Sequence, residues 1–193
     1  NTTGTRNLAI GYAAYDASDT ENDNIAIGYN AMTVNTAGGT KNIAVGNYAL
    51  DALTSGDNNV AVGYNALTGN TSGVFNTAIG NSAFALAVTG DYNTGVGGYA
   101  CQALTSGSSN AGVGYGSLYE ITTGDNNAAS GGQSGEMVTT GSDNTMLGFK
   151  TGAHTTNTTT GGENVLVGAY THAAAADTSQ AHGFGYDLNC AAD

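Results

Sequence analysis

The sequence predicts an all-β fold, a β-solenoid (β-roll) of about eleven 17-residue coils that fills residues 1–193 as a single repeat domain. Three observations lead to this prediction. A phrase in which Asn is followed four residues later by Gly recurs every 17 residues along the chain. The residues between them alternate in size with the period of a strand. With 31 Gly, no Pro and 9% charged residues, the composition is poor in helix formers, and no helical period is present.

The repeats are numbered from their Asn, which is position 0, and an eleventh, degenerate repeat begins at Ala181. The spacing is 17 except for 18 before Asn42 and 20 before Asn164, and both insertions fall in the same segment, which is typical of a loop on one face of a solenoid. We expect the Asn side chains to stack as a ladder, each amide bonding to the coils above and below. The ladder residues are Asn7, Asn24, Asn42, Asn59, Asn76, Asn93, Asn110, Asn127, Asn144 and Asn164.

Position 4 is Gly in every repeat, which predicts a corner where the backbone has positive φ or another chain segment comes too close for a Cβ atom. The corner residues are Gly11, Gly28, Gly46, Gly63, Gly80, Gly97, Gly114, Gly131, Gly148, Gly168 and Gly185.

Two short strands are predicted in each coil. Positions 1–3 alternate between apolar branched and very small residues, as in Val60-Ala61-Val62. Positions 5–8, with a small residue at 7 and a larger one at 8, indicate a second strand. A hydroxyl–Gly turn follows at positions 12–14 (TSG, TTG). One strand spacing per coil gives a rod of roughly 50 Å.

The sequence leaves open whether Ala or Ile/Val lines the interior of the coil. With Ala inside, a stripe of Ile and Val faces outward and drives association. With Ile and Val inside, the outer face is small and flat and suits close packing with another chain. Both alternatives favour a homo-oligomer, and a trimer would bury the stripe. The predicted oligomer stripe is Ile10, Ile27, Val45, Val62, Ile79, Val96 and Val113.

The net charge and the hydropathy of the sequence argue against nucleic-acid binding and membrane insertion. Three Lys and Arg against 15 acids give a net charge of −12, so nucleic-acid binding is not expected. No run of ~18 apolar residues is present, so no membrane insertion is expected. The acids near the end of six repeats predict a solvated edge, with weak Ca²⁺ binding as the alternative and no other cofactor. They are Asp23, Asp57, Asp91, Asp125, Asp143 and Glu163.

No catalytic or metal site is predicted, and the chain is not expected to be an enzyme. The three histidines, His154, His172 and His182, have no metal-site spacing and no nucleophile motif. Cys101 occupies an apolar position of the repeat, and Cys190 lies five coils away, so an intrachain disulfide contradicts the register. Free thiols are expected, with an intermolecular bond through Cys190 left open.

Two surface rows offer weaker alternatives. Tyrosines at position 5 predict either a sugar-stacking ladder or half-buried rings. Threonines of the turn suggest ice binding or, with the sequons at Asn1, Asn70 and Asn157, glycan attachment. The tyrosines are Tyr12, Tyr29, Tyr64, Tyr115 and Tyr186, and the threonines are Thr36, Thr54, Thr71, Thr105, Thr122, Thr139 and Thr156.

The repeats NNVAVGYNAL, followed by TSG, and NIAIGYNAM resemble the N-T-A-I-G-Y-x-A-L repeats of bacteriophage tail fibres. They are similar, more loosely, to the S-V-A-I-G repeats in the heads of trimeric autotransporter adhesins. This resemblance implies a trimeric β-roll on a virion or cell surface, in a stalk or adhesive role.

The predicted function is therefore that of a structural protein in an extracellular or virion fibre, with the chain as a segment or processed subunit of it. The alternative is a subunit that assembles head to tail into an extracellular filament, with glycans as an option, because the chain holds a nearly whole number of repeats. A glycan-binding module and an ice-binding solenoid are the weaker alternatives.

Overall fold

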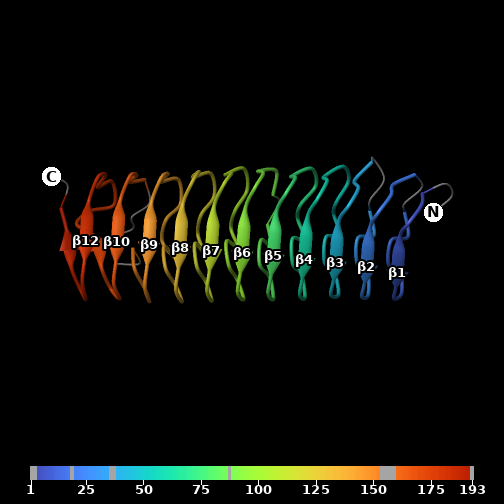
Figure 1. Cartoon of the computed structure of the whole chain (residues 1–193), viewed down its shortest axis with the longest axis horizontal. Coiled ribbons are helices and arrows are strands. Elements are labelled where there is room, and N and C mark those ends of the chain that lie inside the picture. Colours follow the sequence, from blue (N-terminus) through green and yellow to red (C-terminus); the bar gives the residue numbers. More distant parts are fainter. Residues whose placement is uncertain (1–3, 18–19, 35–37, 87, 153–159, 192–193) are drawn as a thin grey trace.

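The structure is a computed structural model, and it describes residues 4–17, 20–34, 38–86, 88–152 and 160–191. The described chain winds into a rod whose coils lie side by side from the N-terminal to the C-terminal end (Figure 1). Its main sheet has eleven parallel strands in the order β1 to β10 followed by β12, and β11 pairs with β13 in a second sheet of two strands. The β-solenoid prediction is confirmed.

Each strand is two or three residues long. The strands are β1 (Leu8–Ile10), β2 (Ile25–Ile27), β3 (Ile43–Val45), β4 (Val60–Val62), β5 (Thr77–Ile79), β6 (Thr94–Val96), β7 (Ala111–Val113), β8 (Ala128–Ser130), β9 (Thr145–Leu147), β10 (Val165–Val167), β11 (His172–Ala173), β12 (His182–Phe184) and β13 (Asn189–Cys190).

Equivalent positions of successive repeats are hydrogen-bonded partners. Between β4 and β5, for example, Ala61 pairs with Ala78 and Val62 with Ile79. The register also holds across the insertion before Asn164, where Leu166 pairs with Met146. Every position of the repeat therefore becomes a row of residues that runs along the rod.

The predicted second strand at positions 5–8 is wrong for the described coils, where these residues form turns. The reason lies in the backbone. Positions 6 and 8 are left-handed, as at Asn65 (φ 54°) and Leu67 (φ 51°), so the chain bends where a strand would run straight. Only the last two coils carry a second strand, β11 and β13, and these begin at position 8.

The interior is lined by Ala, which settles the alternative that the sequence left open. Ala44, Ala61 and Ala78 have no solvent exposure, whereas the first and third residues of their strands are partly exposed. The rest of the core comes from position 8, as with Leu67, and from the segment before the turn, as with Leu53. Ala at position 2 leaves the narrow coil enough room for these larger side chains.

In the core, a large side chain in one coil is matched by a small residue in the neighbouring coil. A Cβ atom on Gly95, at position 2, would lie 2.7 Å from Cε2 of Phe84, at position 8 of the coil before. Three repeats further on the sizes are reversed, with Gly135 at position 8 and Met146 at position 2 of the next coil. Since a close-packed interior tolerates little change in volume, the two positions have to be read together.

Candidate functional surface

The predicted Asn residues stand in one row, which is buried from Asn24 onward, and they join successive coils. The backbone N–H of Asn76 donates to Oδ1 of Asn59 (2.9 Å), and the Asn76 side-chain amide donates to the Gly90 carbonyl (2.9 Å). Six of the amides also donate to Oδ1 of the preceding Asn, as Asn93 does to Asn76 (3.1 Å). The row fixes the chain between two turns, and its side chains face the interior, away from any ligand.

All eleven predicted corner glycines have positive φ, from 122° to 159°. A Cβ atom at Gly114 would lie 2.5 Å from the carbonyl oxygen of Gly131, its neighbour in the same row. Both reasons given for Gly at position 4 therefore hold here: a left-handed backbone and a close approach of the next coil. These residues shape the rod and offer no group for chemistry.

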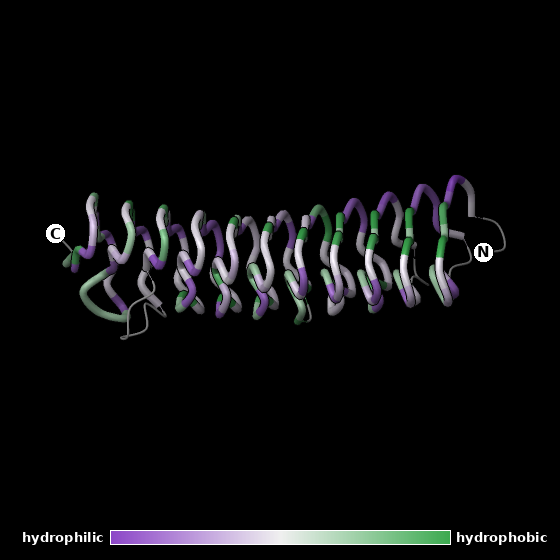
Figure 2. The backbone as a smooth tube through the Cα atoms, turned by 90° about the horizontal axis from the view of Figure 1, so that it is seen from below, coloured by the Kyte–Doolittle hydropathy of each residue, from purple (hydrophilic) through white to green (hydrophobic). Residues whose placement is uncertain are grey.

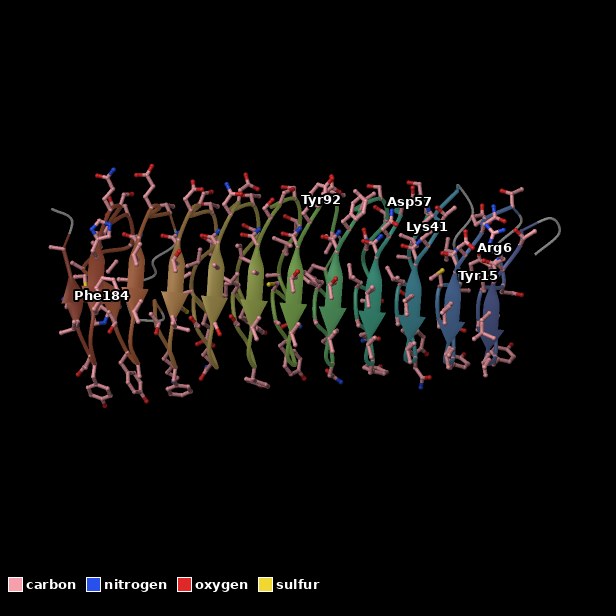
Figure 3. All side chains as sticks on the ribbon, viewed as in Figure 1. Arg6, Tyr15, Lys41, Asp57, Tyr92 and Phe184 are labelled. Carbon is pink, nitrogen blue, oxygen red and sulfur yellow. The ribbon has the colours of Figure 1, made fainter. Side chains whose placement is uncertain are left out.

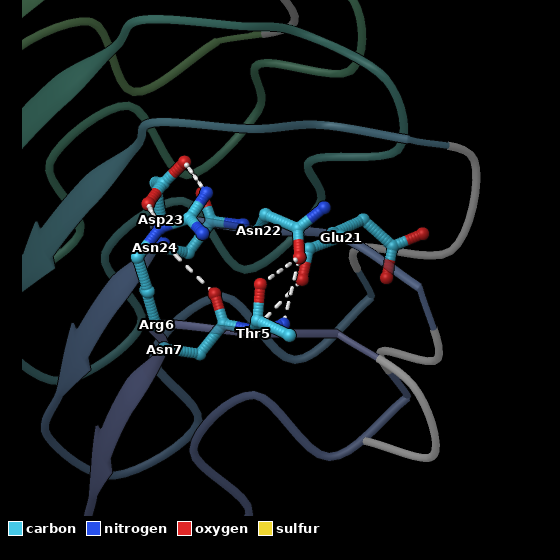
Figure 4. Close-up of polar contacts among 7 residues, drawn as sticks. All are labelled: Thr5, Arg6, Asn7, Glu21, Asn22, Asp23 and Asn24. Carbon is cyan, nitrogen blue, oxygen red and sulfur yellow. Dashed lines mark hydrogen bonds and ion pairs between the residues drawn. The ribbon is translucent and has the colours of Figure 1, made fainter.

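A polar edge runs along the rod beside the Asn row, and it includes Arg6, Lys41 and Asp57 (Figure 3). The first rung of this edge is drawn in Figure 4, where Thr5 meets Asn22 and the Arg6 guanidinium donates to Asp23 (Nη2 to Oδ2, 2.9 Å). Chiefly through the hydrogen bond from Arg6, the pKa of Asp23 is held below its ordinary value. Through these contacts the edge links successive coils and is also a solvated surface.

Several of the predicted acids accept hydrogen bonds from the backbone of the preceding coil. Asp57 accepts from the Thr40 N–H (2.7 Å) and Asp91 from the Val74 N–H (2.8 Å). Such bonds give the carboxylates a structural role. Among the described residues, no group of three or more His, Cys, Asp and Glu is placed to hold a metal ion.

The turn threonines also bond between coils. Their hydroxyls donate to carbonyl oxygens of the next coil, from Thr54 to Thr71 (2.8 Å) and from Thr105 to Thr122 (2.9 Å). Asn70, the one described sequon residue, is buried, and its amide donates to the Gly73 carbonyl. These bonds disfavour ice binding by this row and glycan attachment at Asn70. Asn1, Thr36, Thr156 and Asn157 lie outside the described residues.

The predicted oligomer stripe lies on the outer face of the main sheet. Ile10, Ile79 and Val113 are 54, 41 and 44% exposed, and the other four members are partly buried by their neighbours. Position 1 adds a second row on the same face, beginning with Leu8, Ile25 and Ile43. We call the two rows from β1 to β7 the apolar strip, and Figure 2 shows the recurrence of strongly hydrophobic residues in successive N-terminal coils.

Beyond β7 the outer face changes. Ala128 and Ser130 of β8 replace the larger residues, and an apolar depression of about 240 Å³ opens there between Val113 and Leu147. The continuous part of the strip is thus confined to the first seven strands.

Aromatic rings form a row beside the strip, at positions 5 and 6. The Tyr12 and Tyr29 rings are stacked, with centroids 5.5 Å apart, and Tyr48 packs edge-on between Tyr29 and Tyr64. Desolvation between these rings raises the pKa of Tyr48. Of the predicted tyrosines, Tyr12, Tyr115 and Tyr186 are 74, 63 and 72% exposed, so the row is open to solvent.

The two cysteines are free and buried. Burial raises the pKa of Cys101 to about 12, and it also raises the pKa of Cys190. His172 lies buried on β11 with Nδ1 3.0 Å from the Tyr170 carbonyl oxygen, His182 is exposed on β12, and His154 is outside the described residues. Within the described ranges, these thiols and imidazoles do not take part in any group of three or more His, Cys, Asp and Glu that could hold a metal ion.

The chain matches no protein-family model, no curated protein and no solved structure in a comparison with each. The described residues include no helix that is long and apolar enough to cross a membrane. Inferences about function are therefore drawn from the features of the surface.

Two features of this surface were missed in the sequence. The first is a second ladder, formed two residues before most of the Asn residues of position 0 by Asn, Asp and Ser acceptors, with Ser108 between Asp91 and Asp125. Recurrence of short polar acceptors at that position was the available signal. The second is the left-handed backbone at positions 6, 8 and 16. None of these non-Gly residues is Val, Ile or Thr, although all three are common elsewhere in the chain.

Proposed function

We propose that this protein is a structural subunit of an extracellular or virion fibre, and that copies of it associate side by side, as a trimer, through the apolar strip. The observation that carries the proposal is the outward direction of the Ile and Val rows. The position-3 row is Ile or Val in all seven strands, with Ile79 and Val113 41 and 44% exposed, and the position-1 row is Leu, Ile or Val from β1 to β4. A contiguous apolar face of that length is typical of an interface.

The geometry of the strip favours a partner with the same repeat. Its side chains recur with the coil spacing, ~4.8 Å, so a second rod aligned with the first can match it coil by coil. The strip lacks charged side chains, and the acids are carried on other positions of the repeat. Like charges are thereby kept away from the proposed contact in a chain whose net charge is −12.

The test is to place a charge in the strip. We expect Val62→Asp to break the oligomer into monomers of 19.1 kDa in sedimentation velocity. Circular dichroism should stay unchanged, because the Val62 side chain points out of the coil. Leu86→Asp is the matched control, since Leu86 is 49% exposed but lies in a turn outside the strip. An oligomer that survives Val62→Asp refutes the interface.

A head-to-tail filament is the second candidate, favoured by the sheet edges. β1 and β12 are the edge strands of the main sheet, at opposite ends of the rod, and an edge strand is a template for pairing. Negative-stain micrographs separate the candidates. Rods of uniform length support lateral assembly, and filaments of indefinite length support end-to-end growth.

A further inference from the structure

A hollow of about 350 Å³ interrupts the aromatic side of the rod between the sixth and eighth coils. It is lined by Tyr99, Tyr115, Gly116, Tyr119, Gln133 and Glu136. The hollow arises at position 6, where the neighbouring coils carry Tyr99 and Gln133 and the middle coil carries Gly116. The missing side chain leaves a gap of two coil spacings, roughly 10 Å along the rod.

Three rings and one carboxylate surround this gap. The Tyr99 and Tyr115 rings meet at 80° with centroids 5.7 Å apart, and Tyr115 and Tyr119 are 63 and 37% exposed. Both carboxylate oxygens of Glu136 accept from Nε2 of Gln133, at 3.0 Å each. That bond aligns the carboxylate next to the rings without neutralising it.

The charge of Glu136 has no cationic partner within the part of the chain that the structure describes. The ion pair found there joins Arg6 to Asp23, many coils away. Lys150 is one coil beyond Gln133, but its ammonium lies over the Phe149 ring, 5.7 Å from the centroid. The hollow therefore combines three tyrosine rings with an uncompensated negative charge, on a rod of net charge −12.

We propose that this hollow binds an alkylammonium group, such as the trimethylammonium of choline or a methylated amine. Aromatic faces attract cations that have low hydration, and quaternary ammonium groups are recognised by cages of this kind. The carboxylate adds direct Coulomb attraction, and the field of the acidic rod raises the local concentration of cations. A neutral saccharide gains no net Coulomb attraction from that charge, and Gln133 Nε2, the side-chain amide donor of the hollow, is already bonded to Glu136.

The experiment titrates the intact protein with choline and with tetramethylammonium, and it follows tyrosine fluorescence, since the chain has 11 Tyr and no Trp. The neutral isostere 3,3-dimethylbutan-1-ol has the same shape as choline without the charge. We expect both cations to bind, the isostere to bind about 5- to 30-fold more weakly, and added salt to weaken the cations alone.

Two variants locate the site. Gly116→Asn fills the hollow in a left-handed conformation that Asn30 and Asn65 already adopt at the same position, and Glu136→Gln removes the charge. Ser82→Asn, at position 6 of another coil, is the control for the first. Glu163→Gln is the control for the second, because Glu163 also accepts from a glutamine, Gln180 (2.8 Å).

We expect both site variants to lose at least about 5-fold in affinity and both controls to keep it. Four results would each overturn the proposal. They are equal affinity for the isostere, unchanged binding in Gly116→Asn, binding of N-acetylglucosamine in place of choline, and no binding of either cation at millimolar concentration. The readout is binding by the rod itself, so it stands apart from the test of assembly.

Discussion

At the scale of the residue, the backbone decides which side chains each position accepts. Positions 6, 8 and 16 are left-handed in successive coils, with φ between 50° and 71°. A β-branched residue is strongly disfavoured in that region. Positions 8 and 16 nonetheless carry residues as different as Leu67, Phe84 and Arg6, so backbone fit constrains them more than polarity does.

Leu67 provides the test, with a fully buried side chain at φ 51°. We expect Leu67→Ile to lower the free energy of unfolding by about 2–3 kcal/mol, because left-handed strain adds to the cost of repacking. Leu67→Met, which changes shape without branching at Cβ, should cost less than about 1.5 kcal/mol. Urea denaturation measures both, and equal costs would contradict the backbone argument.

The thiol of Cys101 gives a prediction for pH. Its folded pKa of about 12 lies above the ordinary value of 9.0 because burial disfavours the thiolate. The unfolded chain therefore releases this proton first, and the stability from the raised pKa is complete below pH 9 and declines as the pH rises toward 12. We expect Cys101→Ala to show a shallower fall in melting temperature between pH 9 and 11 than the natural chain; parallel curves would rule this out.

At the scale of the element, one coil is held to the next by rows of hydrogen bonds and by matched volumes. The ladder could be predicted from the sequence, because a residue that recurs every 17 positions must stack in a solenoid. The second strand could not, because small and large residues at positions 7 and 8 fit a buried turn as well as a strand. Strand periodicity over only four residues does not distinguish them.

The ladder is tested at Asn93. Asn93→Ala removes the acceptor of the Asn110 N–H (2.9 Å) and the donor to the Gly107 carbonyl (2.9 Å), and both of those groups lie in the interior. We expect a loss of about 2–4 kcal/mol in the free energy of unfolding, since buried groups are left unpaired. Asn81→Ala, at an exposed turn position, should change stability by less than about 0.5 kcal/mol. If this expectation is wrong, hydrogen exchange in the coils next to Asn93 will be as slow in Asn93→Ala as in the natural chain.

A double-mutant cycle tests whether side chains of neighbouring coils share the same space in the core. Gly95→Ala places a Cβ atom 2.7 Å from the Phe84 ring and should destabilise the protein by about 1–3 kcal/mol. Combining it with Phe84→Leu should recover part of that loss, with a coupling of at least about 0.5 kcal/mol. Additive effects in chemical denaturation would mean that the two positions do not share space.

At the scale of the whole molecule, the rod has unlike sides. A polar edge, an apolar strip and an aromatic row each run along it, because a repeat in register turns every position into a continuous row. Small Ala at position 2 is the residue that sends Ile and Val outward. The sequence alone did not decide this direction, since alternation shows that two faces differ and not which one is inside.

The central claim is that this outward strip joins copies of the chain into a fibre. Sedimentation equilibrium of the natural protein, over concentrations from nanomolar to micromolar, tests it most directly. We predict a discrete multiple of 19.1 kDa, with three as the expected number, that persists at high salt because apolar burial is not screened. A single species of 19.1 kDa throughout that range would contradict the claim.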